Sequence, residues 1–321
     1  MNSYYPLLFT PIFKERIWGG TKLADALHKT IPFAQTGESW ELSTVPGDVS
    51  VVANGSWKGR SLQQLLDQYA VEVLGSKVHA QFGNQFPLLF KFLDAREDLS
   101  IQVHPNDELA AARHQSFGKT EMWYVMQADP GARLLVGFNQ NTSAEAYLKA
   151  LEDKNILSLL DAFPVKQGDV FFLETGTVHA IGAGCLIAEI QQTSDITYRL
   201  YDFDRVDAQG NTRELHIDLA LDAINYQKVA AKKAYQPQIN ALTTVVDCPY
   251  FTTQHVQLEG EFAQSKSGES FTVYMCTEGA FSIAVDGESY DFDLGATVLL
   301  PAAIRNYSLQ GSATLLEIQV K

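Results

Sequence analysis

The chain has 321 residues, of which 38 are acidic and 24 are basic, and its formal net charge is −14. With 46% hydrophobic and 19% charged residues, the composition excludes a disordered chain, and the length suggests about two domains. The acidic balance argues against nucleic acid and anionic membranes as partners, because both bind to basic surfaces.

The start of the chain shows no targeting signal. Residues 1–6 lack the basic and apolar parts of a signal peptide, and no apolar run reaches the roughly 18 residues of a membrane span. The three cysteines, Cys185, Cys248 and Cys276, have no paired spacing and are expected to be reduced, buried thiols. These features predict a cytoplasmic protein.

Four segments are predicted to be helices: residues 61–75 and 214–225 from the spacing of their apolar residues, and residues 106–114 and 143–151 as short helices capped by Asn106 and Ser143. In the first, Ser61 can cap the N-terminus and Gly75 can end the helix. In residues 214–225, Leu215, Leu219 and Ala223 would form one apolar side.

Most of the remaining chain consists of aromatic and β-branched runs punctuated by Gly, Pro, Asn and Asp. Examples are residues 168–173, 186–191 and 271–276, which are typical of short strands in a sandwich or barrel. A polar stretch over residues 227–240 separates a final strand-rich part from the rest. We therefore expect a domain boundary near this stretch.

A degenerate internal repeat relates the two parts. Gly168 and His179 in the first copy correspond to Gly295 and Asn306 in the second, and both copies resemble the cupin motif G-x5-P-x-G-x2-H. In that motif a turn between two strands points a His into a small barrel. Because Asn306 replaces the His, only the first half is expected to carry chemistry. The predicted fold is mainly β, with a catalytic cupin or jelly-roll domain and short helical insertions over residues 1–235, and a smaller degenerate cupin-like domain over residues 236–321.

Several polar residues of the first half suit a metal site. Ser100, Gln102 and His104 would share one face of a strand, which either lines a pocket or lies in water. Glu121 begins an aromatic strand, where it is either solvated or, if buried, in need of a cation. His179 alone could be a structural histidine. Together, the two imidazoles, the carboxylate and the Gln102 amide suit Zn²⁺ with an open position, or the iron of a two-His-one-carboxylate oxygenase.

The segment after His179 is rich in charges. Glu189 would lie on one face of a strand, and Arg199 and Arg205 follow as nearby cations. Arginine binds phosphate through paired hydrogen bonds, so this segment fits a polar anionic substrate. The alternative for each arginine is an ion pair with a neighbouring aspartate. The remaining histidines are expected at surface or capping positions: His28, His79, His114, His216 and His255.

These motifs resemble the type I mannose-6-phosphate isomerases, a zinc-dependent family of cupins. Residues 100–105 are close to the family signature, residues 119–121 are similar to its Lys-Pro-Glu element, and residues 194–199 are similar to its Ser-Asp-Asn…Arg element. Residues 16–20 and 37–41 resemble the short bacterial branch, which lacks a large helical insertion. The likeness extends over about residues 5–226, and its separate motifs occur in the same order as in the family.

The resemblance implies an enzyme that interconverts mannose 6-phosphate and fructose 6-phosphate through an enediol. Its partner would be a small-molecule sugar phosphate, and the oligomeric state is left open. One Zn²⁺ per chain would be held by Gln102, His104, Glu121 and His179.

The resemblance also implies roles around the substrate. Ser100 and Arg199 would bind the phosphate, while Lys119 and Glu189 would line the sugar as catalytic candidates, with the choice of base open. Gly118 stands where the family often has a His, so a ring-opening role for that His does not carry over. The competing functions are a cupin iron oxygenase and a non-catalytic cupin that binds a sugar phosphate.

Overall fold

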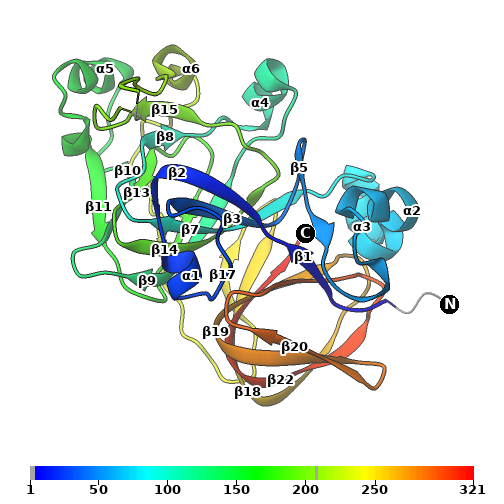
Figure 1. Ribbon diagram of the computed structural model, residues 1–321. Coiled ribbons are helices and arrows are strands. Elements are labelled where there is room, and N and C mark those ends of the chain that lie inside the picture. The colour runs from blue at the N-terminus through cyan, green and yellow to red at the C-terminus, as the bar shows by residue number, and fades with distance from the viewer. Residues whose placement is uncertain (1–3, 207–208) are drawn as a thin grey trace.

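The computed structural model describes residues 4–206 and 209–321 (Figure 1). Residues 1–3, on which the signal-peptide expectation partly rests, lie outside this range. The described chain is mainly β, as predicted, and its strands form antiparallel sheets of eight, seven, five and two strands. No helix in the two described ranges is both long enough and apolar enough to cross a membrane.

Two of these sheets pack face to face and hold the first half of the chain. The first has the spatial order β16 (Lys232–Lys233), β12 (Val170–Leu173), β9 (Glu121–Ala128), β14 (Cys185–Gln192), β7 (Leu88–Ala95), β2 (Ile12–Gly20) and β3 (Thr36–Leu42). The second has the order β11 (Leu160–Pro164), β10 (Arg133–Phe138), β13 (His179–Ile181), β8 (Ile101–Val103) and β15 (Tyr198–Tyr201). One apolar cluster joins their facing sides, with Leu93 and Trp123 from the seven-stranded sheet and Leu134 and Ile181 from the five-stranded one.

The outer face of the seven-stranded sheet is covered as well. A second apolar cluster contains Phe90 and Phe92 from β7 together with Phe271 and Leu316 from the C-terminal part of the chain. Strand β7 is therefore buried along its whole length. Burial on both faces explains why apolar residues occupy successive positions in β7 and β14 instead of alternating with polar ones.

The C-terminal sheet curves around its own apolar cluster (Figure 1). Its order is β17 (Thr243–Asp247), β18 (Thr252–Ser265), β22 (Asn306–Gln319), β19 (Thr272–Val285), β21 (Thr297–Leu300), β1 (Leu7–Thr10) and β6 (Val51–Val52), with β20 (Glu288–Asp293) beside β19. Strand β1 comes from the N-terminus, and Leu7 lies opposite Leu299. The division between residues 235 and 236 stays a prediction, and the hydrogen bonds of β1 cross it. A short pair, β4 (Thr44–Val45) and β5 (Asp48–Val49), completes the strands.

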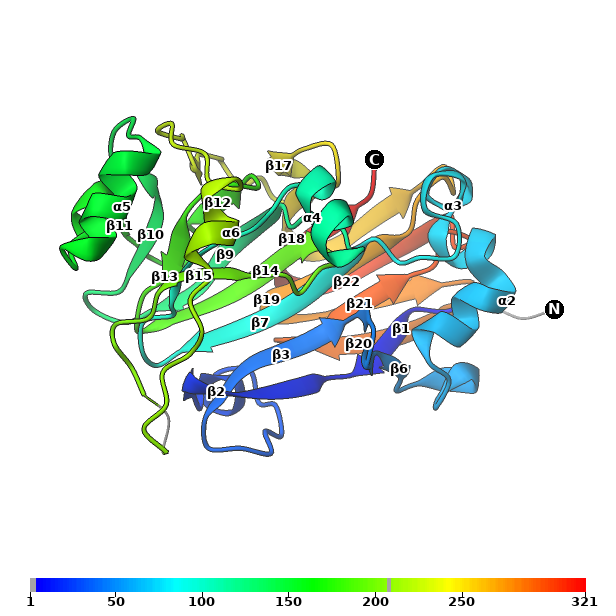
Figure 2. The ribbon, with the colours of Figure 1, turned by 90° about the horizontal axis from the view of Figure 1, so that it is seen from above.

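Helices cover the two ends of the molecule, with α2 and α3 at one end and α5 at the other, while α6 and α4 lie between them (Figure 2). The helices are α1 (Lys22–Asp25), α2 (Leu62–Leu74), α3 (Ser76–Phe82), α4 (Asp107–His114), α5 (Ala144–Glu152) and α6 (Ile217–Leu221), with 3₁₀ turns at Gly55–Trp57 and Ile156–Leu159. The side chains of Ser61, Asn106 and Ser143 cap α2, α4 and α5 as predicted, because each accepts a hydrogen bond from a first-turn N–H.

The predicted helix over residues 214–225 is wrong in its extent, because α6 spans only Ile217–Leu221. Leu215 and Leu219, expected on a common apolar side, are 45% and 38% exposed. The reason is a tertiary contact: the Nδ1 atom of His216 accepts a hydrogen bond from the backbone N–H of Arg199, and the helix starts after it.

His255 is also placed differently from the prediction. It lies on β18 and is 4% exposed, packed against the rings of Tyr124 and Tyr235. Its polar sequence neighbours suggested a surface position, but Tyr124 and Tyr235 cover this side of β18. Burial lowers the pKa of His255 to about 4.

His255 should therefore make the fold sensitive to acid. Unfolded histidine titrates near pH 6.5, so between about pH 6.5 and 4 the unfolded chain binds a proton that the folded chain does not. Acid then lowers the free energy of unfolding, by up to roughly 3 kcal/mol from this one group. Urea unfolding across this pH range should show a shallower decline for His255→Gln than for the unmodified protein. His28→Asn, at an exposed position, is the control, and equal declines for His255→Gln and the unmodified protein would contradict the prediction.

Candidate active site

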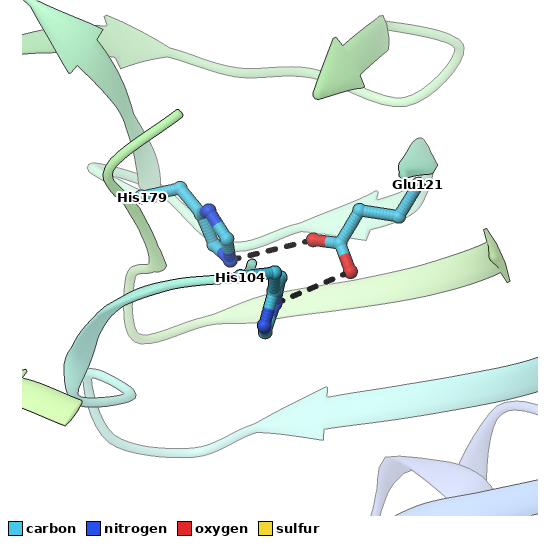
Figure 3. A group of neighbouring side chains, drawn as sticks. All are labelled: His104, Glu121 and His179. Atoms are coloured by element: carbon cyan, nitrogen blue, oxygen red, sulfur yellow. Dashed lines mark ion pairs between the residues drawn. The ribbon is translucent and has the colours of Figure 1, made fainter. Parts of the chain in front are cut away.

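Three predicted residues, His104, Glu121 and His179, converge between the two facing sheets (Figure 3). The Nε2 atom of His104 lies 3.5 Å from Oε2 of Glu121, and Nε2 of His179 lies 3.4 Å from Oε1. All three side chains are buried, and their possible ligand atoms lie within 4.8 Å of one another. The side chains therefore point at a common centre from different parts of the chain.

The sheet pairing explains this convergence. His179 begins β13 and is the direct partner of Gln102 on β8, and His104 follows β8 by one residue. Glu121 begins β9 in the opposite sheet, where Leu173 and Gln191 flank it on the neighbouring strands. The two imidazoles thus come from one layer and the carboxylate from the other.

Both histidines present an unprotonated Nε2 to the centre. The Nδ1–H of His104 donates to the carbonyl of Ile196 at 2.9 Å, and that of His179 donates to the carbonyl of Thr177 at 2.8 Å. Burial lowers the pKa of His104 well below its ordinary value and that of His179 to about 4. Two neutral imidazoles with a fixed tautomer are the form in which histidine binds a metal ion.

Glu121 completes a set of atoms that fits a metal ion. Its side chain has no exposure, and burial raises its pKa to about 7. Among the described residues, neither carboxylate oxygen of Glu121 nor Nε2 of His104 has a hydrogen-bond partner. The Gln102 amide lies 3.3 Å from Nε2 of His179, and the Lys119 ammonium lies 3.4 Å from Glu121. His104, Glu121, His179 and Gln102 could together hold a divalent cation.

A cleft of about 680 Å³ opens beside this cluster. Five of the predicted residues line it: Ser100, Gln102, Lys119, Glu189 and Arg199. Gln102 and Lys119 also contact the cluster, so they connect the cleft to the candidate metal centre. A small polar molecule in the cleft would therefore lie beside Gln102 and Lys119, between walls that carry both cationic and acidic side chains.

A row of paired residues crosses the sheet beside the cleft, and Glu189 is the member that the sequence analysis named as a site residue. Three members of the row, Trp40, Lys91 and Glu189, line the cleft. Trp40, Lys91, Glu189 and Trp123 lie directly opposite one another on β3, β7, β14 and β9. The ammonium of Lys91 lies 3.2 Å from Oε1 of Glu189, and the indole N–H of Trp123 donates to Oε2 at 2.9 Å. Burial alone would raise the pKa of Glu189, but the Lys91 and Lys119 ammonium groups outweigh it and hold that pKa below its ordinary value. Lys91 could have been found as one of two charged residues, with Asp94, in an otherwise apolar strand.

The structure separates the two arginines that the sequence analysis treated alike. Arg205 forms an ion pair with Asp202 at 2.6 Å, which confirms the alternative that this arginine pairs with a neighbouring aspartate. Arg199 lies opposite Gln102 on β15 and donates to the carbonyl of Glu214, and in the described part of the chain it has no ion pair. Burial and the nearby Arg213 lower the pKa of Arg199. An anion between Arg199 and Arg213, which both line the cleft, would relieve this repulsion.

Comparisons with known proteins agree with this arrangement. Residues 7–129 match the family described as phosphomannose isomerase type I, catalytic domain, and residues 241–320 match the mannose-6-phosphate isomerase cupin domain. Mannose-6-phosphate isomerase ManA of Bacillus subtilis (strain 168) is 40% identical over 96% of this chain and 96% of that protein. A mannose-6-phosphate isomerase of Streptococcus mutans serotype c is 36% identical over 97% of each.

Solved structures extend the likeness to the whole fold. The crystal structure of the mannose 6-phosphate isomerase from Bacillus subtilis has a TM-score of 0.89 and 34% identity, and the match covers 98% of this chain and 99% of that one. The structure of a putative mannosephosphate isomerase from Archaeoglobus fulgidus has a TM-score of 0.82 at 22% identity, with both chains fully covered. The second match concerns the fold alone. Both halves of the chain therefore have counterparts in these proteins.

Proposed function

The chain belongs to the type I phosphomannose isomerase family, and we propose that it interconverts mannose 6-phosphate and fructose 6-phosphate through an enediol, with one Zn²⁺ per chain. The observation that carries this proposal is the buried His104–Glu121–His179 cluster at a cleft lined by Lys119 and Arg199. The isomerases matched by both halves of the chain argue against an iron oxygenase or a non-catalytic binding protein.

The zinc ligands in this proposal are Gln102, His104, Glu121 and His179. Their support is the fixed tautomer of both imidazoles and the absence, within the described residues, of hydrogen-bond partners for the Glu121 oxygens. When bound, Zn²⁺ would act as a Lewis acid that polarises sugar oxygens and stabilises negative charge on them.

Glu189 and Lys119 take the base and acid roles. The reaction needs a base to remove a proton from C2 or C1 and an acid or cation beside the developing oxyanion. Glu189 suits the base, because Lys91 and Trp123 hold its carboxylate ionised and fixed at the cleft. Lys119 suits the acid: burial lowers its pKa, but Glu121 and Glu189 outweigh burial and keep it protonated.

Ser100 and Arg199 bind the phosphate of the substrate in this proposal. Both line the cleft, and Arg199 follows Glu189 closely enough in the chain to reach the same space. The phosphate is remote from the reacting carbons, so its binding energy serves to position them. We also propose a cytoplasmic location, which the three free, buried cysteines support.

Activity should depend on the metal. A coupled assay should detect isomerisation of mannose 6-phosphate that is lost after treatment with a chelator and restored by Zn²⁺. His179→Ala should lose zinc on dialysis, because removing one of a few ligands strongly weakens a metal site. Metal analysis of the purified variant measures this, with His79→Ala, outside the cluster, as the control. Stoichiometric zinc and full activity in His179→Ala would show that the assignment is wrong.

Glu189→Gln tests the base. The substitution keeps the size of the side chain and removes the basic oxygen, so kcat should fall by about 10²- to 10⁴-fold, the usual contribution of a general base. KM and zinc content should stay close to those of the unmodified protein. Steady-state kinetics and metal analysis on one preparation measure all three quantities. A kcat within a few-fold of the unmodified value would assign the base elsewhere.

Arg199 tests the phosphate site. A charge-assisted contact contributes roughly 1.5–3 kcal/mol, so Arg199→Ala should lower kcat/KM by about 10- to 100-fold. Arg199→Lys should recover only part of this loss, because an ammonium lacks the paired donors of a guanidinium. Zinc content and melting temperature should change little. A destabilised Arg199→Ala with normal kcat/KM per folded molecule would instead indicate a structural arginine.

A further inference from the structure

The carboxylate of Asp107 accepts hydrogen bonds from three residues in separate parts of the chain, Gly118, Gln192 and Tyr250. It lies at the start of α4, and its Oδ1 accepts hydrogen bonds from the backbone N–H of Gly118 at 2.8 Å and from the side chain of Gln192 at 3.0 Å. Its Oδ2 accepts a hydrogen bond from the hydroxyl of Tyr250, shortly before β18, at 2.6 Å. Asp107 does not line the 680 Å³ cleft, so any effect on the reaction must pass through its partners.

Gln192 carries the connection further. This buried residue ends β14, and its Oε1 accepts a hydrogen bond from the backbone N–H of Thr120 at 2.9 Å. Its own backbone N–H donates to the carbonyl of Thr120 at 3.1 Å. The two N–H groups that flank Lys119 are therefore both held, that of Gly118 by Asp107 directly and that of Thr120 through Gln192.

The contact with Gly118 depends on the absence of a side chain. A Cβ atom at this position would lie 2.6 Å from the backbone N of Asp107 and 2.8 Å from the carbonyl carbon of Asn106. Such distances are shorter than real contacts, so any side chain at position 118 would displace the start of α4. The backbone of Asn106 and Asp107 thus occupies the space into which a larger residue would project.

We propose that Asp107 is a positioning residue for Lys119, and that Tyr250 ties this position to the C-terminal part of the chain. The inference rests on the proposed function in giving Lys119 a catalytic role. Lys119 is 5% exposed and its ammonium lies beside Glu121, so its reach into the cleft is set by its backbone. A displacement of about 1 Å at a reacting group can cost on the order of 100-fold in rate.

A double-mutant cycle tests whether Asp107 acts through Lys119. Asp107→Ala should lower kcat by about 10- to 100-fold with KM nearly unchanged, because substrate contacts remain while the acid is misplaced. In a Lys119→Met background, Asp107→Ala should lower kcat by less than about twofold, since the group it positions is already gone. Losses that multiply in the double variant would overturn the proposal.

Two further variants separate positioning from folding. Asp107→Asn should recover most of the activity, because its amide can still accept from Gly118 and can donate to the Tyr250 hydroxyl. Tyr250→Phe removes one of the three hydrogen bonds and should lower kcat by only a few-fold, on the order of 1 kcal/mol. Glu108→Ala, an exposed acid in the same first turn of α4, is the matched control and should leave kcat unchanged.

Hydrogen exchange of the metal-free protein gives a readout that does not need activity. In Asp107→Ala the amides of Gly118 and Thr120 should exchange at least about tenfold faster, because their acceptors are lost or released. Amides in the middle of β9 should keep their protection. Unchanged exchange at both amides would overturn the positioning role. Full activity of Lys119→Met, together with faster exchange in Asp107→Ala, would refute the catalytic role of Lys119 and leave the structural connection intact.

Discussion

The site depends on one carboxylate that is withdrawn from water. Glu121 has no exposure, and burying an ionised carboxylate costs several kcal/mol unless a cation compensates it. Lys119 at 3.4 Å supplies part of that compensation, while both oxygens face two imidazole nitrogens that have no proton to give. The strands around Glu121 thus hold an arrangement that a divalent cation would stabilise. Metal affinity and folding stability are expected to be coupled here.

The cleft beside this site is polar although the strands that build it are buried on both faces. The antiparallel register makes the burial of these charges possible, because it places Lys91 directly opposite Glu189. A tryptophan lies on the other side of each, Trp40 beside Lys91 and Trp123 beside Glu189. Opposite charges at paired positions neutralise each other, and the Trp123 indole satisfies a remaining oxygen. The charged groups are consequently fixed before a substrate arrives, and little reorganisation remains at the moment of reaction.

Local signals in the sequence predicted much of this structure. The caps at Ser61 and Asn106 could be predicted because a cap depends on residues only three positions away. The position of His179 could be predicted because this residue belongs to a short turn motif. The errors lie where distant contacts decide. His255 has polar neighbours in sequence but is covered by Tyr124 and Tyr235, and Lys91 gains its importance from register with β3 and β14. The clustering of His104, Glu121 and His179 was predictable because each lies in its own motif; the row across the sheet was not.

The pairing of β1 with β21 has a consequence for how the chain is made. Leu7 lies opposite Leu299, so β1 leaves the ribosome long before β21, the strand with which it forms hydrogen bonds. Such contacts between distant segments slow folding, since the entropy of closing the loop is lost before the pairing is gained. Until then the apolar side of β1 lacks its cover, and the nascent chain is exposed to aggregation. Completion of the C-terminal sheet therefore waits until β21 has been made.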